Sequence, residues 1–494
     1  MNLGVVARMI GFLLLLLGVV GCVPLVIDWA AEMPVRPWLK MSGVSFCIGL
    51  LLVLFGRRHA AAVGPREGAA ITVGSWLALS GVAAIGLNLA IPGATAAECW
   101  FEAISGLTTC GLSAFGERLS IESMTPGTLL FRALLQWMGG VGVIALGLVL
   151  MPMLKGGASF QLFRSEASGL ALDRLTPRLA DTVRFILIYN LALNLCMTIA
   201  LWLTGISWFE ALCHALSTIS SGGFSTRDAN IAGLANPAAE WVLLVGMLVA
   251  GINFMLVVAA MRGQPWALWR SEEVRAYLLA CLIATAAVTT IVLLSGRPYT
   301  GEPLTLIRHA AFAVVSLGTS TGFTLGFQHD PQGWAGWPPA AVVVLMLCAL
   351  GIGCTGSTAG GAKMLRMLLI FKSTRRAIRQ FAEPAAILPM TLDGRPLADR
   401  AVLLATAWIA CFLLSLVVAT IALLLCAPID LMSAISVVYT SLSNAGPGLG
   451  AFGPERSAQA AGPAGMIVLG LCMLVGRLEF LAVFLLLSPY TWRR

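Results

Sequence analysis

Four short segments of this 494-residue chain repeat one pattern of hydroxyl side chains and glycine. Aligned on their last glycine without gaps, they carry serine or threonine six and three residues before it in every copy. They are Ser105–Gly111, Ser217–Gly223, Ser316–Gly322 and Thr440–Gly446. Glycine can adopt a positive φ and turn its carbonyl aside, and rings of backbone carbonyls replace the hydration shell of a monovalent cation. A single copy would favour a re-entrant packing loop, but four in register predict a pore.

The rest of the chain is strongly apolar. Hydrophobic residues make up 59% and charged residues 11%, whereas soluble proteins carry about 25% charged residues. This excludes a soluble enzyme, a disordered regulator and a collagen-like chain, and it predicts a polytopic membrane protein in contact with lipid. Ten stretches are long enough to cross a bilayer: 5–27, 41–56, 70–92, 127–154, 183–204, 239–261, 276–295, 339–372, 401–427 and 464–489. The first also resembles a lipoprotein signal ending at Cys22.

Ten spans place both termini on one side of the membrane. With both termini cytoplasmic, 22 of the 31 lysines and arginines fall in inner segments, as the positive-inside rule requires. The basic residues that give the net charge of +8 are thus explained by membrane orientation, and we expect no nucleic-acid partner. The arginines of the inner loops 155–182 and 372–400 could contact lipid headgroups or a regulatory protein; they are Arg164, Arg174, Arg178, Arg375, Arg376 and Arg379.

The repeat predicts how the pore is built. Its glycines are 112, 99 and 124 residues apart, and each unit reads as span, short helix, glycine loop and span. Two spans per unit give every copy the same orientation, so four units can surround an axis along the membrane normal. We therefore predict an all-α fold of ten transmembrane helices with a pseudo-fourfold pore.

Five glycines interrupt the eighth stretch, and they predict an intramembrane loop that gates the pore. They are Gly351, Gly353, Gly356, Gly360 and Gly361. Glycine costs about 1 kcal/mol relative to alanine inside a helix, so five close together should break it. The alternative is close helix packing through Gly356 and Gly360.

Arg477 is the 14th residue of the last predicted span. A charge at mid-membrane costs about 2.5–3.5 kcal/mol on insertion scales and rarely faces lipid, and Glu479, two residues on, points elsewhere. Since a guanidinium only donates hydrogen bonds, we expect Arg477 to bind free carbonyls of the glycine loop and hold it closed. Snorkelling to the inner surface is the alternative.

Other chemistry finds little support in the sequence. The 12 cysteines and four histidines show no disulfide or metal-ligand spacing, and there is no nucleotide-binding fingerprint. We expect no enzymatic active site and no cofactor.

The glycine segments resemble those of the TrkH/TrkG potassium-uptake subunits of the Trk/Ktr/HKT superfamily, and the similarity covers essentially the whole chain. The matching motifs are Ser105–Gly111, Ser221–Asp228, Ser320–Phe323, Asn444–Gly450, Trp137–Gly142, Gly351–Gly361 and Gly476–Glu479. The resemblance implies a homodimer in the bacterial inner membrane, with one pore per subunit and a cytosolic TrkA-type ring that binds nucleotides.

The resemblance also implies a division of the chain into two extra N-terminal helices and four pore repeats. The ranges are 1–69 for the extra helices and 70–154, 155–262, 263–400 and 401–494 for the repeats. In the wider family, serine in place of the first-loop glycine accompanies sodium preference, so Gly111 points to potassium as the transported ion. Cys110 departs from the small hydroxyl residue usual there.

The resemblance further implies which backbone carbonyls form the filter. The expected ligands are Thr109, Cys110, Gly111, Ser221, Gly222, Gly223, Ser320, Thr321, Gly322, Asn444, Ala445 and Gly446, with Leu112, Phe224, Phe323 and Pro447 outermost. A sodium-permeable pore and a proton- or sodium-coupled potassium symporter on the same fold remain alternatives.

Overall fold

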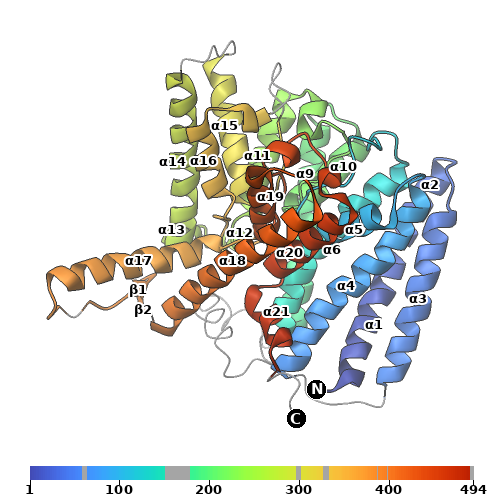
Figure 1. Ribbon diagram of the computed structural model, residues 1–494, viewed down its shortest axis with the longest axis horizontal. Helices are drawn as coiled ribbons and strands as arrows, with labels where there is room; N and C mark the ends of the chain where they lie inside the picture. The colour runs from blue at the N-terminus through green and yellow to red at the C-terminus, as the bar shows by residue number, and fades with distance from the viewer. Residues whose placement is uncertain are drawn as a thin grey trace.

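The computed structural model describes residues 1–57, 64–150, 179–295, 302–325, 333–386, 388–397 and 399–489. Nearly all regular structure in these ranges is helical (Figure 1). Strands β1 (Thr391–Leu392) and β2 (Arg395–Pro396) form a short antiparallel hairpin. Most of the predicted inner loop 155–182, with its three arginines, lies outside the described residues.

Seven helices of the described residues are long and apolar enough to cross a bilayer, or eight if one bent pair counts as a span. The seven comprise α1 with α2 (Leu3–Val20, Cys22–Ala30), α3 (Arg36–Gly56), α4 (Pro65–Ala90), α9 (Leu179–Trp202), α14 (Glu272–Leu294), α18 (Asp399–Cys426) and η5 with α20 (Ala458–Ala461, Gly462–Arg477). The bent pair is α11 (Pro237–Ala250) with α12 (Phe254–Met261). The fourth predicted stretch coincides with α6 (Pro126–Leu150). The chain is thus a helical integral membrane protein.

Four short helices precede the four glycine segments, as the repeat predicts. They are α5 (Ala96–Leu107), α10 (Trp208–Ile219), α15 (Pro303–Gly318) and α19 (Leu431–Ser443). In three of them a side chain just before the helix, that of Thr95, Ser207 or Asp430, accepts a hydrogen bond from a first-turn N–H. Helices of 12–16 residues span roughly 18–24 Å, less than the ~30 Å bilayer core, so each can end inside the membrane.

The prediction of a continuous span over 239–261 is wrong. Helices α11 and α12 are bent by 102° at the break between them. The irregular segment 349–362 bonds the peptide groups that the break releases: the N–H of Cys354 donates to the carbonyl of Gly251 at 2.8 Å, and the N–H of Phe254 donates to the carbonyl of Gly356 at 3.1 Å. Hydropathy registers only the apolar run and cannot show that a distant segment replaces the bonds of the helix.

The last predicted span, 464–489, is also broken. Helix α20 ends at Arg477, and α21 (Phe480–Leu487) begins after Glu479, which has a φ of 67°. The Glu479 carboxylate accepts hydrogen bonds from Arg366 at 2.8 Å and from Trp408 at 3.0 Å. These bonds hold a backbone conformation that costs about 1–3 kcal/mol in a residue with a side chain. Arg477 therefore lies at a helix end and not inside a continuous helix.

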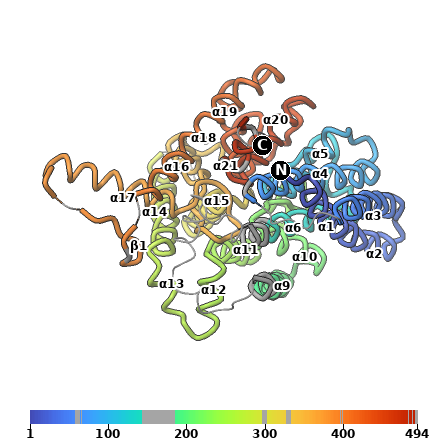
Figure 2. Tube along the Cα trace, turned by 90° about the horizontal axis from the view of Figure 1, so that it is seen from below, coloured from blue at the N-terminus to red at the C-terminus, as the bar shows by residue number. Residues whose placement is uncertain are grey.

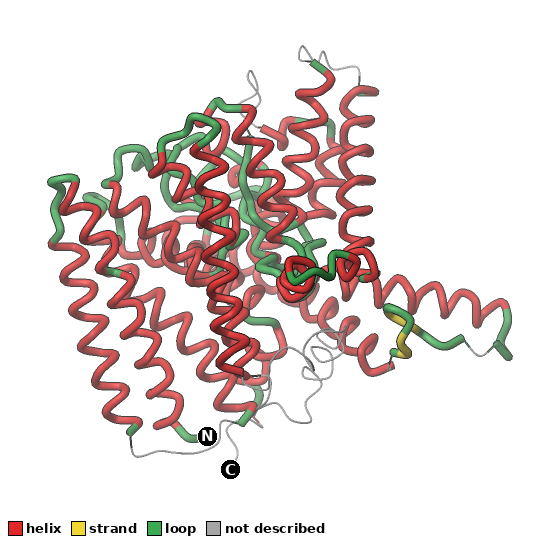
Figure 3. Tube along the Cα trace, turned by 180° about the vertical axis from the view of Figure 1, so that it is seen from behind, coloured by secondary structure: helices red, strands yellow, loops and turns green. Residues whose placement is uncertain are grey.

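The interruption predicted in the eighth stretch is present. Helix α16 (Pro339–Cys348) ends early, and Gly351, Gly356 and Gly361 have φ of 97°, 74° and 74° in the irregular segment. The following helix, α17 (Lys363–Ala382), carries six basic residues and projects away from the helical body (Figures 1 and 3). It is not among the described helices that are apolar enough to cross a membrane.

The remaining described elements are short. They are helix α13 (Trp266–Arg270) and the 3-10 helices η2 (Asn230–Leu234), η3 (Gly333–Gly336) and η4 (Gly450–Phe452).

The chain travels once around the molecule. In Figure 2 the colour passes from blue through green and yellow to red around a common centre. Helix α20 packs against α5, so the last quarter of the chain meets the first. Phe101 of α5 and Met473 of α20 belong to one buried apolar cluster at this junction. The fold therefore brings the four short helices to one centre.

Candidate functional site

The four short helices end in the same hydrogen-bonded turn. In each, the N–H of the residue before the last glycine donates to the carbonyl six residues before that glycine, at 2.8–3.0 Å. The donor–acceptor pairs are Cys110 with Ser105, Gly222 with Ser217, Thr321 with Ser316, and Ala445 with Thr440. A second bond, one residue inside the first, completes a Schellman motif. The four segments thus share one backbone conformation although their side chains differ.

Two left-handed residues shape each loop. The first stands two residues before the last glycine and has φ of 53–55°; these residues are Thr109, Ser221, Ser320 and Asn444. The second is the last glycine itself, with φ of 79–85°; these are Gly111, Gly223, Gly322 and Gly446, here called the ring glycines. None of the first set is glycine, so each loop holds about 1–3 kcal/mol of backbone strain there.

The hydroxyls three residues before the ring glycines bond within their own helices. Each donates to the carbonyl four residues earlier, at 2.7–3.0 Å. The residues are Thr108, Ser220, Thr319 and Ser443. The last carbonyls of a helix lack backbone partners within it, and these hydroxyls donate to them. The hydroxyls repeated in the sequence therefore belong to the ends of the four short helices.

The four loops close into a ring. A Cβ added to a ring glycine would lie 2.1–2.9 Å from the carbonyl oxygen of the residue just before the ring glycine of the next loop. The contacts run from Gly111 to Gly222, from Gly223 to Thr321, from Gly322 to Ala445, and from Gly446 back to Cys110. Four carbonyls from distant parts of the sequence therefore each lie against the ring glycine of a neighbouring loop, in cyclic order.

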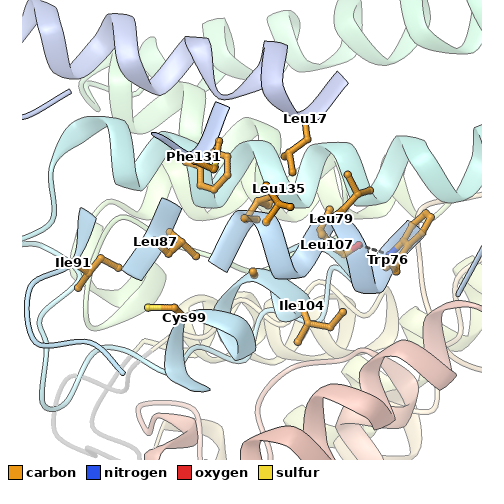
Figure 4. Packing of buried hydrophobic residues seen from close by; sticks show 14 of the residues in the cluster. Leu17, Trp76, Leu79, Leu87, Ile91, Cys99, Ile104, Leu107, Phe131 and Leu135 are labelled. Carbon is orange, nitrogen blue, oxygen red and sulfur yellow. Dashed lines mark hydrogen bonds between the residues drawn. The ribbon is translucent and has the colours of Figure 1, made fainter. Parts of the chain in front are cut away.

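Glycines on the flanking helices let the loops come this close. A Cβ on Gly139 of α6 would lie 2.0 Å from the carbonyl oxygen of Leu107, and one on Gly476 of α20 would lie 2.0 Å from that of Leu442. Both carbonyls belong to the residue four before a ring glycine. Trp76 also donates its indole N–H to the carbonyl of Leu107 at 3.1 Å, within the apolar packing of Figure 4. The first loop is thus held from two sides.

A cavity of about 50 Å³ opens on one side of the ring. The residues that bring all four loops to its wall are Gly111, Leu112, Gly223, Phe224, Gly322 and Pro447. Because these are three of the ring glycines and residues that directly follow ring glycines, the cavity lies at the end of the loops where the chain leaves the ring.

A buried ion pair joins the first two loops beside this cavity. Arg132 donates to Glu102 at 2.7 Å, and the two side chains are 2% and 0% exposed. Arg132 also donates to the carbonyl of Ser225 at 3.0 Å and covers the ring of Phe224 at 4.4 Å. Glu102 accepts the N–H of Ala114 at 2.8 Å. Each ion therefore has further partners, as a buried charge requires.

We expect Glu102→Ala to lower the free energy of unfolding by about 3–5 kcal/mol, because it leaves Arg132 buried without its carboxylate. Arg118→Ala is the matched control, since the Arg118–Glu98 pair at 2.6 Å has an arginine that is 46% exposed and should contribute about 1 kcal/mol or less. Thermal unfolding in detergent measures both. Equal shifts for the two variants would contradict the assignment.

The segment 349–362 lies against the other end of the loops. The hydroxyl of Thr358 is 2.9 Å from that of Ser221, and the N–H of Gly360 donates to Ser320 at 2.5 Å. A Cβ on Gly360 would lie 2.8 Å from the carbonyl oxygen of Ser443. The segment therefore contacts residues that precede three of the ring glycines, whereas residues that follow them line the cavity.

Arg477 binds this segment. Its Nη1 donates to the carbonyl of Thr358 at 2.8 Å, and the side chain is buried. Its Nε and Nη2 have no hydrogen-bond partner among the described residues. The expected contact with a carbonyl of the glycine loop is thus present; its effect on ion flow stays a prediction.

Besides Arg132 and Glu102, two further buried residues of the site were not anticipated by the sequence analysis. Glu273 of α14 accepts the N–H of Thr355 at 2.6 Å and so anchors the segment 349–362. Gln136 of α6 contacts the second loop. Gln136 could have been noticed as a side-chain amide within an apolar span, next to the Trp137–Gly142 motif. Glu273 resembles an ordinary acidic residue in the first turn of a helix.

Comparisons with known proteins agree with this picture. Residues 39–492 match the TrkH family, described as a cation transport protein. The chain is 32% identical over 461 residues to the Trk system potassium uptake protein TrkH of Salmonella typhimurium, covering 93% of this chain and 92% of the relative. It is 31% identical over 500 residues to TrkH of Escherichia coli K12, covering 100% of both. The crystal structure of the potassium transporter TrkH from Vibrio parahaemolyticus matches with a TM-score of 0.88 at 29% identity, covering 100% of both chains.

Proposed function

The chain belongs to the TrkH family of cation transport proteins, and we propose that it takes up potassium through a selectivity filter built by its four glycine loops. The observation that carries the proposal is the cyclic contact between each ring glycine and a carbonyl of the next loop. Such a ring of carbonyls suits a dehydrated monovalent cation. The carboxyl ends of α5, α10, α15 and α19 also meet there, and each helix dipole favours a cation by about 0.3–1 kcal/mol.

The proposed ligands are the backbone carbonyls of the residues expected from the sequence. In each loop they are the left-handed residue, the residue after it and the ring glycine. The four loops then belong to four repeats, preceded by the pair of N-terminal helices, within ten membrane crossings. Both termini would lie in the cytoplasm, because that orientation leaves most basic residues inside.

The segment 349–362 is the proposed gate. Its contacts with Ser221 and Ser320 bring it to the inner end of the loops. Arg477 would hold it there through Thr358 and add a positive charge on the ion path. A cation leaving the filter would meet both the backbone and the charge.

The family relation supports the remaining parts of the proposal. The relatives are named as members of a Trk system, which suits a chain that works with partners. We place it in the bacterial inner membrane as a homodimer under a cytosolic TrkA-type ring that binds nucleotides. Exposed Arg375 and Arg379 of α17 would contact either that ring or lipid headgroups.

Uptake measurements separate this proposal from its alternatives. Bacterial cells that lack their own potassium-uptake proteins should, when they express this chain, take up potassium faster than sodium. Liposomes that contain the purified protein and have an imposed membrane potential should take up potassium whether or not a proton or sodium gradient is present. Equal rates for the two ions would favour the sodium-permeable alternative. Uptake that stops when the proton or sodium gradient is removed would favour symport. No potassium uptake in any condition would overturn the proposal.

A further inference from the structure

The second loop differs from the others at the residue before its ring glycine. Cys110, Thr321 and Ala445 stand at this position in the other loops, and each has a Cβ, whereas the second loop has Gly222. Gly222 is not among the glycines with positive φ, so its backbone conformation does not demand glycine. Glycine is required here by the available space, because an added Cβ would lie 2.4 Å from the side-chain Cδ of Gln136.

Gln136 fills this space with hydrogen bonds that fix its orientation. Its Nε2 donates to the carbonyl of Gly222 at 2.6 Å. Its Oε1 accepts the N–H of Phe224 at 3.2 Å and the hydroxyl of Ser217 at 2.7 Å. A carbonyl can only accept and a backbone N–H can only donate, so the amide cannot be reversed. The side chain is fully buried.

Gln136 also replaces a bond found in two other loops. Ser105 donates to the carbonyl of Leu112 at 2.6 Å, and Ser316 donates to that of Phe323 at 2.7 Å, which ties the start of each loop to its end. Ser217 is the equivalent serine, and it donates to Gln136 instead. The second loop is therefore closed through a side chain of α6.

We propose that Gln136 is a specificity-determining positioning residue, whose amide holds the Gly222 carbonyl in the ring. This rests on the proposed function, since it concerns the same filter. The ring carbonyl of Gly222 shares its lone pairs between the amide and an ion, and its position is fixed by α6. It therefore cannot move inward to follow a smaller cation. Without the amide, this quarter of the ring adapts to sodium, and discrimination falls, because selectivity depends on the field strength and flexibility of the carbonyls.

The first test compares Gln136→Met, which keeps the length of the side chain and removes its hydrogen bonds, with the wild type. The potassium-to-sodium ratio of initial uptake rates should fall at least about fivefold, because the Gly222 carbonyl and two other buried groups lose the partner that fixes them. Gln459→Met is the control, because Gln459 is not among the residues that line the cavity beside the ring and makes only a weak bond to Glu98 at 3.4 Å. It should keep the wild-type ratio.

The second test uses the missing Cβ. Gly222→Ala should nearly abolish uptake, because its methyl group meets the Gln136 amide. Adding Gln136→Ala should restore uptake to at least the level of Gln136→Ala alone, since the second loop then has a Cβ at this position as the fourth does. Losses that simply add would overturn the inference. The inference would also be overturned if Gln136→Met, present in the membrane at normal amounts, kept the potassium-to-sodium ratio of the wild type. In that case the proposed function would still stand, provided that the wild type itself prefers potassium. A wild type without potassium uptake would overturn both.

Discussion

Gly111→Ala should lower the potassium-to-sodium ratio of initial uptake rates by about tenfold or more. The φ of 84° at Gly111 is strained for any residue with a side chain, by about 1–3 kcal/mol. The added Cβ would also lie 2.3 Å from the carbonyl oxygen of Gly222, so one of the two must move. A change of 1.4 kcal/mol in relative ion binding is a factor of ten. Cells that lack their own potassium-uptake proteins serve for the measurement.

The other ring glycines should follow an order set by their distances. Gly223→Ala should match Gly111→Ala, because its Cβ would lie 2.1 Å from the next carbonyl oxygen. Gly322→Ala and Gly446→Ala, at 2.9 and 2.8 Å, should have smaller effects. Gly205→Ala is the matched control, since Gly205 has a φ of 95° and open space around it. Unchanged ratios in all four ring variants, with normal insertion, would remove the filter assignment.

Arg477→Ala should leak potassium in the absence of any regulator. The substitution removes the bond to Thr358 and a buried positive charge. A unit charge about 8 Å from the ion path contributes about 2 kcal/mol at an effective dielectric constant of 20, so flux should rise roughly 30-fold. Arg477→Lys should be intermediate, because lysine keeps the charge and loses the planar fork. Potassium flux into liposomes that contain only the purified protein measures the effect.

The control for Arg477 is Arg376→Ala on α17, which removes a basic residue whose carboxylate partner, Asp399, lies 2.9 Å away. It should leave the flux unchanged. Wild-type flux in Arg477→Ala, with the protein folded and inserted, would contradict the role given to the arginine in the gate.

Patterns within a short stretch of sequence predicted most of the site. The hydroxyl and glycine spacing located all four loops, because the same spacing terminates each short helix and turns its backbone. The glycines of 351–361 predicted an irregular segment, and the polarity of Arg477 predicted a carbonyl partner. In each case the residue type indicates the local structure: glycine indicates an irregular backbone, and a buried arginine indicates hydrogen-bond acceptors nearby.

Contacts between distant segments could not be predicted in this way. The break after Gly251 exists because the segment 349–362 takes over its hydrogen bonds, and an apolar run gives no sign of that exchange. The break at Glu479 depends on Arg366 and Trp408, which lie on other helices. The role of Gln136 depends on the absence of a side chain at Gly222. Each of these features depends on a contact between two residues. A single sequence shows the two residues but not that they are in contact.

The closed ring has a genetic consequence. In a pore assembled from four identical subunits, one codon change alters the same ligand in all four subunits, so no ligand can change alone. Here each quarter of the ring is encoded separately, and Cys110, Gly222, Thr321 and Ala445 already differ. A single mutation therefore changes one of the four proposed ligands and leaves three quarters of the ring intact, so ion preference would change in small steps.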